Sequence, residues 1–323
     1  MIKFNNCITS SENLVTSPAQ RRAGFMEAAL EKNRKSKSYI DEAKTLKQLA
    51  SKASEATDLL SIPAIRDGLL TASGLSDKSW KYFTERDKTE AIKKLIEEFL
   101  EPSGDGFIDE LVHRFLLIKG DSFGGSMRNL VGKIAEMKFV RKLLSVLSIS
   151  GATYRVLSKE NKKKKKNLWQ DMSYKKDYEL ADSIAAITWE LKGKNRVIFF
   201  NRKIPLVGHN VDICVFSGDE TDYNSGAIVH EHKKAIMFGE LKGGIDPAGA
   251  DEHWKTCLSA LERIRNKYKK ESIQVLISFL GAAIEKKMAD EIWEQLIDGT
   301  LSNAANLTED EQLTNYCEWI VKL

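Results

Sequence analysis

The sequence is poor in cysteine, and the cysteines that it has are scattered. It contains four among 323 residues, with no Cys-x-x-Cys pair and no tight spacing. This pattern excludes a disulfide-stapled scaffold and a site in which thiolates hold a metal ion. Cys214 and Cys257 lie among apolar residues, so we expect both to be small buried side chains.

Long apolar runs and a strong net charge are also missing. No stretch approaches the roughly 18 uncharged apolar residues of a membrane-spanning helix. The first residues, MIKFNNCITSSENLV, lack the apolar core of a secretory signal. We therefore expect a cytoplasmic protein with no membrane partner. The formal net charge is only +4, from 50 basic and 46 acidic residues, so total charge does not by itself indicate a nucleic-acid partner.

Positive charge is concentrated in one segment, KENKKKKKN at residues 159–167. Two interpretations of this segment stay open. It is either a solvated loop or a contact with the phosphates of a polyanion, to which each lysine adds a salt-dependent contribution that does not depend on sequence.

The character of the chain changes near residue 150. Before it, helix-forming residues dominate, as in DKTEAIKKLIEEFLEP, where the helix should stop at Pro102. We interpret GDSFGGSMRN, residues 120–129, as a Gly-rich turn that opens a long amphipathic helix. After residue 150 we predict five strands from β-branched and aromatic runs: ATYRVLS, NRVIFF, NVDICVF, KAIMFGEL and IQVLISFL. The prediction is an α/β fold, with a helical region at 1–120 and a mixed central sheet flanked by helices at 121–323.

The tetrapeptide ELKG occurs twice, at residues 190–193 and 240–243. In the second copy, the apolar run AIMF precedes the motif and predicts a buried strand. Side chains two residues apart on a strand point to the same side, so Glu240 and Lys242 should project together while Leu241 faces the core. Asp212 lies inside another apolar run, NVDICVF, where a carboxylate needs a cation or a hydrogen-bond donor to offset its burial.

Asp212 and Glu240 together would supply oxygen ligands of the kind that Mg²⁺ accepts, and the Leu241 carbonyl could add a third. Lys242 would then orient or help to deprotonate the attacking water and offset phosphate charge. The metal would lower the pKa of that water and stabilise developing negative charge. We therefore choose the second copy as the candidate active site.

The first copy, WELKGK, fails the same test. The residues before it, DYELADSIAAITW, are more typical of a helix than of a buried strand. We therefore interpret Glu190 and Lys192 as a solvated pair.

Three longer stretches, GDSFGGSMRNLVGKIAEMKF, GHNVDICVF and GELKGGIDPAGADEHWKT, are more specific than the short motif. With them the chain resembles the type II restriction endonucleases of the BsoBI and AvaI kind, which belong to the PD-(D/E)xK nucleases; here the first half of that signature is Val-Asp. The resemblance implies a PD-(D/E)xK core with catalytic Asp212, Glu240 and Lys242. It also implies a homodimer that cuts double-stranded DNA at the palindrome CYCGRG with Mg²⁺, and a protecting DNA methyltransferase in the same host. The helical region would embrace the DNA and form dimer contacts.

Two residues after the second ELKG copy have open roles. Histidine is the residue type whose charge ordinarily changes near neutral pH, so His253 could act as a general base for the water; the alternative is a histidine on the surface or at the start of a helix. Asp246 could accept a hydrogen bond from a cytosine in the major groove; the alternative is an N-cap for a helix beginning at Pro247.

Further candidates for DNA contact lie before residue 130. In SWKYF, Lys81 stands among aromatic residues, which either pack on a helix or deliver a base or phosphate contact. Gly124 and Gly125 would allow the backbone to approach a phosphate, with Ser126 and Arg128 as donors.

Glu136, on the long helix that follows, is interpreted as a surface residue, although it could supplement the metal site.

Two other functions remain as alternatives to a site-specific endonuclease. One is a repair nuclease that recognises DNA structure, and the other is a DNA-binding protein without catalysis. The complete set of Asp212, Glu240 and Lys242 argues against the second.

Overall fold

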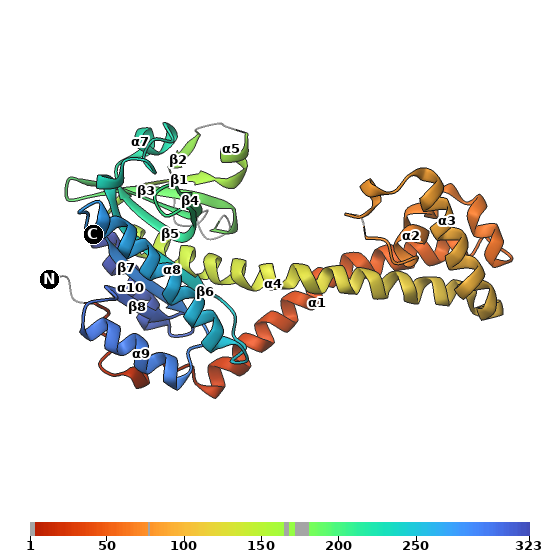
Figure 1. Ribbon diagram of the computed structural model, residues 1–323, viewed down its shortest axis with the longest axis horizontal. Helices are drawn as coiled ribbons and strands as arrows, with labels where there is room; N and C mark the ends of the chain where they lie inside the picture. Colours follow the sequence, from red (N-terminus) through yellow and green to blue (C-terminus); the bar gives the residue numbers. More distant parts are fainter. Residues whose placement is uncertain (1–3, 77, 165–167, 172–180) are drawn as a thin grey trace. The chain divides into compact units, whose positions relative to one another are not determined.

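A computed structural model describes residues 4–76, 78–164, 168–171 and 181–323. The chain forms two compact units (Figure 1), which we call the helical unit, residues 26–130, and the sheet unit, residues 1–25 with 131–323. The predicted units, residues 1–120 and 121–323, differ from these in two ways: the first 25 residues belong with the sheet, and the helical unit extends to residue 130. Ile8 and Leu14 are buried in the core of the sheet unit, and the Asn5 side chain donates a hydrogen bond to the Gln312 carbonyl over 2.7 Å.

Two long helices, α1 and α4, contribute residues to both units. Buried leucine, isoleucine and phenylalanine side chains form the core of the helical unit, among them Leu59, Leu69 and Ile92. The elements from the first long helix to the second are α1 (Pro18–Ala50), η2 (Ala56–Ser61), η3 (Pro63–Ile65), α2 (Arg66–Ala72), η4 (Trp80–Tyr82), α3 (Glu85–Leu95), the π-helical η5 (Ile96–Leu100), η6 (Glu101–Gly106) and α4 (Phe107–Ile149).

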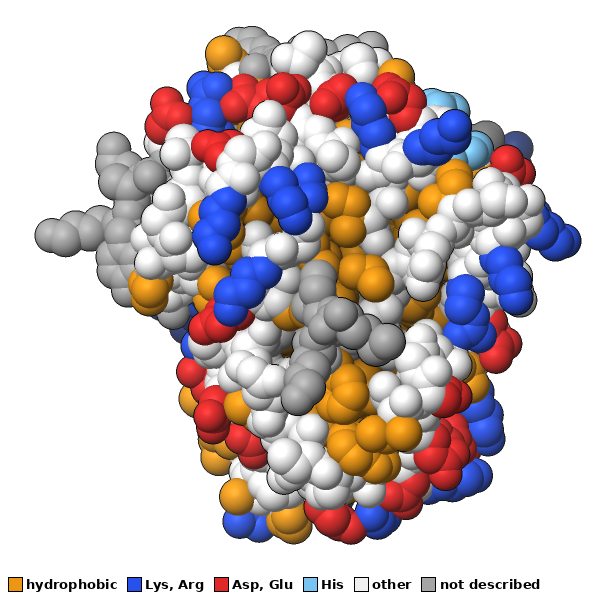
Figure 2. Space-filling view, turned by 90° about the vertical axis from the view of Figure 1, so that its left-hand side faces the viewer, with side chains coloured by type: hydrophobic (Ala, Val, Ile, Leu, Met, Phe, Trp, Pro, Cys, Tyr) orange, Lys and Arg blue, Asp and Glu red, His pale blue; other side chains and the backbone are white. Residues whose placement is uncertain are grey.

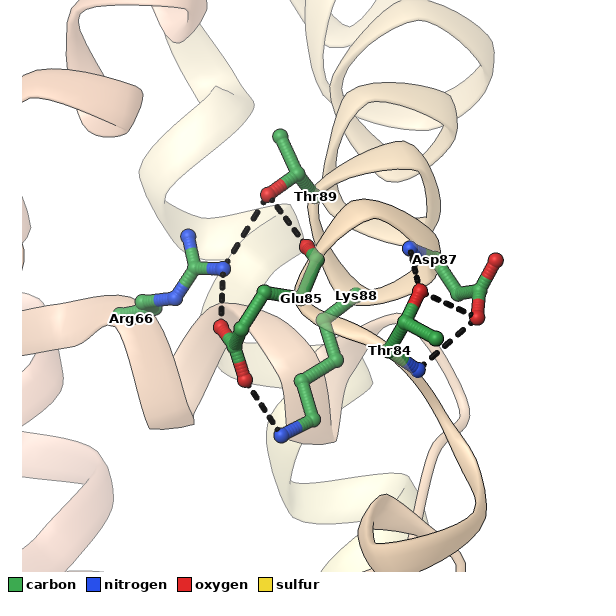
Figure 3. Close-up of polar contacts among 6 residues, drawn as sticks. All are labelled: Arg66, Thr84, Glu85, Asp87, Lys88 and Thr89. Atoms are coloured by element: carbon green, nitrogen blue, oxygen red, sulfur yellow. Dashed lines mark hydrogen bonds and ion pairs between the residues drawn. The ribbon is translucent and has the colours of Figure 1, made fainter.

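The start of α3 shows how local sequence fixes this unit (Figure 3). The hydroxyl of Thr84 accepts a hydrogen bond from the backbone N–H of Asp87, and the Asp87 carboxylate accepts one from the N–H of Thr84. Such a capping box satisfies donors that a helix start otherwise leaves unpaired. Arg66, on α2, donates to Glu85 and Thr89, and so ties α2 to α3. The helix predicted for this segment is confirmed.

The Gly-rich turn predicted at residues 120–129 is wrong. The backbone is helical without interruption from Phe107 to Ile149, and Gly124 and Gly125 lie inside α4. Glycine weakens a helix by only about 1 kcal/mol per residue, so packed neighbours can override it. One such neighbour is Phe123, which is buried and meets the ring of Tyr39 edge-on at 5.4 Å.

The sheet unit is built on eight strands in the order β2-β1-β3-β4-β5-β6-β7-β8. Neighbours from β2 to β6 are antiparallel, whereas β6, β7 and β8 are parallel. The strands are β1 (Thr153–Ser158), β2 (Trp169–Asp171), β3 (Ile184–Leu191), β4 (Lys194–Ile204), β5 (His209–Ser217), β6 (Ala235–Lys242), β7 (Leu276–Gly281) and β8 (Asn303–Asn306). The helical elements of this unit after α4 are α5 (Lys159–Lys163), η7 (Ala181–Ser183), α7 (Glu220–Asn224), η8 (His232–Lys234), α8 (Ala250–Lys270), α9 (Lys286–Ile297) and α10 (Asp310–Lys322), and η1 (Ser11–Leu14) lies near the N-terminus.

Two apolar cores lie against this sheet. One contains Trp254 and Leu261 of α8 with Leu296 of α9, and we call its side the α8 side. The other contains Phe139 of α4 and Tyr316 of α10. Because a mixed sheet covered by helices was expected here, this part of the predicted fold is confirmed.

All five predicted strands are present, but the segment before the first ELKG copy was predicted wrongly. Ile184–Leu191 is strand β3 and not a helix, and six consecutive residues from Ile184 to Trp189 are buried. A strand covered on both sides is apolar at every position, so it lacks the alternation that identifies a half-exposed strand. Its sequence therefore resembles that of a buried helix.

Charges of both signs are mixed on the molecular surface. On the face seen in Figure 2, lysine and arginine side chains alternate with acidic ones, and apolar side chains are visible between them. This agrees with the small net charge of +4. Among the described helices, none has the length and apolar content required to cross a membrane.

Candidate active site

The second ELKG copy lies at the end of β6, where β5 and β6 stop pairing. The last paired residues at this end are Ile213 and Gly239. One step further, the antiparallel register places Asp212 opposite Glu240. Directly opposite residues in an antiparallel pair project to the same side of the sheet, so the two carboxylates share a side.

The side chain of Asp212 accepts a backbone hydrogen bond just beyond the last paired residues of β5 and β6. Its Oδ2 accepts a hydrogen bond from the backbone N–H of Leu241 over 2.9 Å. Because the N–H and C=O of a strand residue point to the same side, the Leu241 carbonyl also faces β5. The Leu241 side chain packs against the core that contains Phe139, on the other side of the sheet from the carboxylates.

Lys242 lies beside both carboxylates. Its Nζ is 3.1 Å from Oε2 of Glu240 and 3.8 Å from Oδ2 of Asp212. Burial favours the neutral amine, but neighbouring acidic groups, among them the carboxylates of Glu240 and Asp212, outweigh burial and raise the pKa of Lys242 above its ordinary value. Lys242 is therefore a fixed cation at neutral pH.

Glu240 is the most buried of the three, with only 7% of its surface exposed. Burial, followed by the charge of Asp212, raises the pKa of Glu240 from 4.5 to about 7, although Lys242 acts in the opposite direction. The thiol of Cys257, on α8, donates a weak hydrogen bond to Glu240 Oε2 over 3.8 Å. Burial raises the pKa of Cys257, so the group beside Glu240 is the neutral thiol.

The loop after β6 approaches α4 closely. A Cβ added to Gly243 would lie 2.4 Å from Cβ of Ala135 and 2.9 Å from the carbonyl oxygen of Val131, whereas a Cβ on Gly244 would meet nothing within 4 Å. The glycine that ends the motif is thus required by packing.

This contact predicts different outcomes for two neighbouring glycines. Gly243→Ala should lower the free energy of unfolding by about 1–3 kcal/mol, because the helix or the loop must move. Movement of about 1 Å next to Lys242 should also slow cleavage by about 10²-fold. Gly244→Ala should leave both quantities near those of the wild type. Urea unfolding and single-turnover cleavage of the two variants test this, and equal effects would contradict it.

The first ELKG copy lies in the hairpin between β3 and β4. Glu190 and Lys192 are exposed, and Lys192 has a positive φ of 52°. Glu190 accepts a hydrogen bond from the N–H of Gly193 over 2.7 Å, so its carboxylate closes the turn. The interpretation as a solvated pair is confirmed, although the helix proposed before it was wrong.

His253 and Asp246 are both exposed, and neither forms a hydrogen bond or ion pair with the three site residues within the described part of the chain. His253 lies on α8 four residues before Cys257, and so about one helical turn from the thiol that contacts Glu240. Asp246 accepts a hydrogen bond from the N–H of Ala248 and stabilises a turn. The predicted N-cap role was wrong, because α8 begins at Ala250 with Gly249 as its N-cap.

The other predicted contact residues before residue 130 lie in the helical unit. Lys81 Nζ lies 5.0 Å from the ring centre of Tyr82, a ring that is 79% exposed. Gly124, Gly125 and Ser126 are exposed on α4, and the Ser126 hydroxyl donates to the Phe123 carbonyl. The side chain of Arg128 is outside the described part of the structure.

Glu136 belongs to the sheet unit. It pairs with Lys159 over 2.9 Å and not with the metal-site candidates.

The residues at the end of β6 fit a divalent cation that prefers oxygen. The carboxylates of Glu240, which is buried, and Asp212, which is half-buried, lie side by side, and Lys242 is the cation paired with them among the described residues. Burial, followed by the charge of Asp212, raises the pKa of Glu240, which a bound cation would offset. Within the described ranges, no group of three His, Cys, Asp or Glu side chains could hold a metal. The protein would therefore supply two carboxylates and a backbone carbonyl, as Mg²⁺ sites that keep several waters commonly do.

Comparison with known proteins decides the family. The family model described as "Restriction endonuclease BsobI" matches residues 4–323. The chain belongs to this family. It is 47% identical over 320 residues to the type II restriction enzyme BsoBI of Geobacillus stearothermophilus, covering 99% of this chain and 98% of that protein. It is 44% identical over 316 residues to type II restriction enzymes AvaI of Nostoc sp. and Anabaena variabilis, covering 98% of each chain. The resemblance inferred from sequence motifs is confirmed, as is the prediction of an enzyme of this type.

The sequence patterns of this BsobI-family chain did not predict the contact between Cys257 and Glu240. Cys257 was expected only to fill space, and its complete burial agrees with that. Cys257 follows Glu240 by 17 residues in the sequence. A loop and the start of α8 lie between them, and no local sequence pattern specifies how these segments bring the two side chains together. The signal that could have found it is the position of Cys257 on the apolar stripe of α8, with Trp254 and Leu261.

Proposed function

We propose that this chain is a type II restriction endonuclease that makes Mg²⁺-dependent double-strand cuts in DNA at the degenerate palindrome CYCGRG. The observation that carries the proposal is the grouping of Asp212, Glu240 and Lys242 at one end of the sheet. It occurs in a chain that matches restriction enzymes over almost its whole length.

In this proposal Asp212, Glu240 and the Leu241 carbonyl hold the metal ion. A divalent cation bound there acidifies a water molecule and neutralises charge on the phosphate. Lys242 keeps its proton and places a positive charge where negative charge develops on the phosphate oxygens. Because Lys242 keeps its proton, we assign the acceptance of the attacking water's proton to His253, which lies near the start of α8, about one helical turn before Cys257.

The DNA partner imposes a symmetry. A palindrome presents the same sequence on both strands, so two copies of the chain related by a two-fold axis would place one active site on each strand. We propose a homodimer for this reason. Asp246 would contact DNA from the sheet unit. The helical unit would add contacts through Lys81, through Gly124, Gly125 and Ser126 on the exposed surface of α4, and through Arg128. A DNA methyltransferase in the same host, which protects the host's own sites, completes the system, and this chain acts in the cytoplasm.

The charge of Lys242 leads to a prediction. Lys242→Met should lower the single-turnover cleavage rate by about 10²–10³-fold, the range found when one preorganised electrostatic group is removed. Binding of a duplex in Ca²⁺ should change little, because Lys242 acts mainly on charge that develops during the reaction. Lys192→Met is the matched control from the other ELKG copy and should cleave like the wild type. A similar loss in both variants would contradict the assignment.

The function is tested by comparing otherwise identical duplexes that carry CYCGRG or a site with one base changed, each incubated with Mg²⁺. We expect a double-strand cut only in the first. Cutting that ignores the sequence but follows branches or nicks would support a structure-reading nuclease instead. Binding without cutting in any divalent metal would support a non-catalytic DNA-binding protein.

A further inference from the structure

Arg202, on β4, lies next to the active site although no motif identifies it. In the pairing of β4 with β5, Phe200 is opposite Ile213 and Arg202 is opposite Val211. Asn201, between them, is therefore the cross-strand neighbour of Asp212. Adjacent strands are about 4.8 Å apart, so the backbone at Arg202 lies one strand from the metal-site candidate.

An unusual backbone conformation directs Arg202 to the side of the carboxylates. Asn201 has a positive φ of 46°, which interrupts the alternation of the strand. Before it, Phe200 belongs to the core on the far side from α8. Two residues after Arg202, Ile204 belongs to the core on the α8 side. The charges of Arg202, Asp212 and Glu240 all act on the pKa of the Cys214 thiol, which also lies in the α8-side core, although burial is the main cause of its rise.

Lys162 brings a second cation to the same end of the sheet. It lies in α5, which directly follows β1, and the end of β1 is in line with the site because Ser158 pairs with Ile184 at the start of β3. Lys162 is half-buried. Burial, then the positive charges of Arg202 and Lys159, lowers the pKa of Lys162, which places Arg202 and Lys162 near each other.

Neither cation has a direct polar partner within the described part of the chain. No hydrogen bond or ion pair joins the side chain of Arg202 or of Lys162 to another described residue. Lys159, by contrast, is paired with Glu136. Two half-buried positive charges that repel each other are unfavourable for folding alone. An anion from outside the protein would compensate both.

We propose that Arg202 and Lys162 form a subsite that binds a backbone phosphate of the DNA strand, next to the phosphate that is cut. This inference rests on the proposed function. It also gives the basic segment at 159–167 a defined role: Lys162, and not the run as a whole, contacts DNA. A guanidinium and an ammonium group on two different elements can grip one phosphate from two sides, which fixes the position of the strand over Asp212.

The first test is the salt dependence of binding. Arg202→Gln, Lys162→Gln and the double variant would be compared with wild type by fluorescence anisotropy on a CYCGRG duplex in Ca²⁺, between about 50 and 200 mM salt. Each neutralised phosphate contributes about 0.9 to the slope of log K against log salt, so the double variant, which loses one phosphate contact, should lose about 0.9. Arg263→Gln, on the exposed surface of α8, and Lys194→Gln, at the other end of β4, are matched controls and should keep the wild-type slope.

The second test locates the phosphate. A series of duplexes would each carry one neutral methylphosphonate, at successive positions around the cut. Wild type should lose about tenfold in affinity at one position near the cut, and the double variant should lose nothing further there. Equal losses in the two proteins at every position would overturn the subsite, as would slopes unchanged from wild type.

These outcomes separate the subsite from the function itself. A wild type that neither binds nor cuts CYCGRG duplexes would refute the proposed function. A wild type that cuts normally while the variants keep its slope would refute the subsite alone. The variants should also unfold at the wild-type temperature or above, because no described partner is lost and a repulsion is relieved. If Arg202→Gln fails to fold, Arg202 has a structural role that the proposal does not contain, and the proposal is wrong for that residue.

Discussion

Replacing Glu240 by glutamine is expected to lower the single-turnover rate of DNA cleavage by at least about a thousandfold, equivalent to roughly 4 kcal/mol of transition-state stabilisation. Glutamine keeps the shape of the side chain but removes one of the two negative charges proposed to hold the metal ion. The side chain is almost completely buried, so no water-exposed acid can substitute for it. The rate would be measured with excess enzyme on a CYCGRG duplex in saturating Mg²⁺.

Glu190→Gln provides the matched control, since Glu190 occupies the same place in the other ELKG copy. Its carboxylate is exposed and closes a hairpin turn, so the variant should cleave at the wild-type rate. If Glu190→Gln were the inactive variant and Glu240→Gln active, the site would have to be rebuilt at the β3–β4 hairpin.

The stability of the metal-free protein should depend on pH through Glu240. Its pKa is about 7 in the folded protein and ordinarily 4.5, so the folded state holds this proton more tightly than the unfolded state. The free energy of unfolding therefore falls as the pH rises from about 4.5 through about 7, by up to about 3 kcal/mol from this group. Because glutamine does not titrate, Glu240→Gln should remove this pH-dependent decrease in the free energy of unfolding. In chelator, the variant should be more stable than wild type at pH 8, and the difference should shrink towards pH 5.

Urea unfolding of wild type, Glu240→Gln and Glu190→Gln at several pH values would test this. Adding Ca²⁺ at pH 8 should stabilise the wild type and leave Glu240→Gln almost unchanged, because a ligand stabilises only a folded state that binds it. A difference between wild type and Glu240→Gln that does not vary with pH would contradict the buried carboxylate with a raised pKa described above.

Much of the fold could be predicted because sheet strands here have distinct sequence patterns. The apolar runs around Asp212 and before Glu240 identified β5 and β6, and the two-residue period placed Glu240 and Lys242 on one side. An Asp inside an apolar strand needs a partner, and the structure supplies one in the Leu241 N–H. Local reasoning was thus sufficient to choose between the two ELKG copies.

Other features depend on contacts between distant parts of the chain. Complete burial made β3 resemble a helix, and packing of neighbours such as Phe123 carried α4 through glycines that suggested a turn. The contact of Cys257 with Glu240 and the position of Arg202 beside Asp212 follow from strand register and helix docking, which no short motif encodes. Sequence patterns identify residues on the same strand more readily than residues brought together by neighbouring strands.

The most direct test of the central claim is cleavage of a plasmid carrying one CYCGRG site by wild type and by Asp212→Asn. Each protein would be incubated with Mg²⁺, with Ca²⁺ and with chelator. We predict linear DNA with ends at that single site only for wild type with Mg²⁺, and binding without cutting in Ca²⁺. Cutting by wild type in chelator, or by Asp212→Asn at the wild-type rate, would contradict a metal ion held by Asp212 and Glu240.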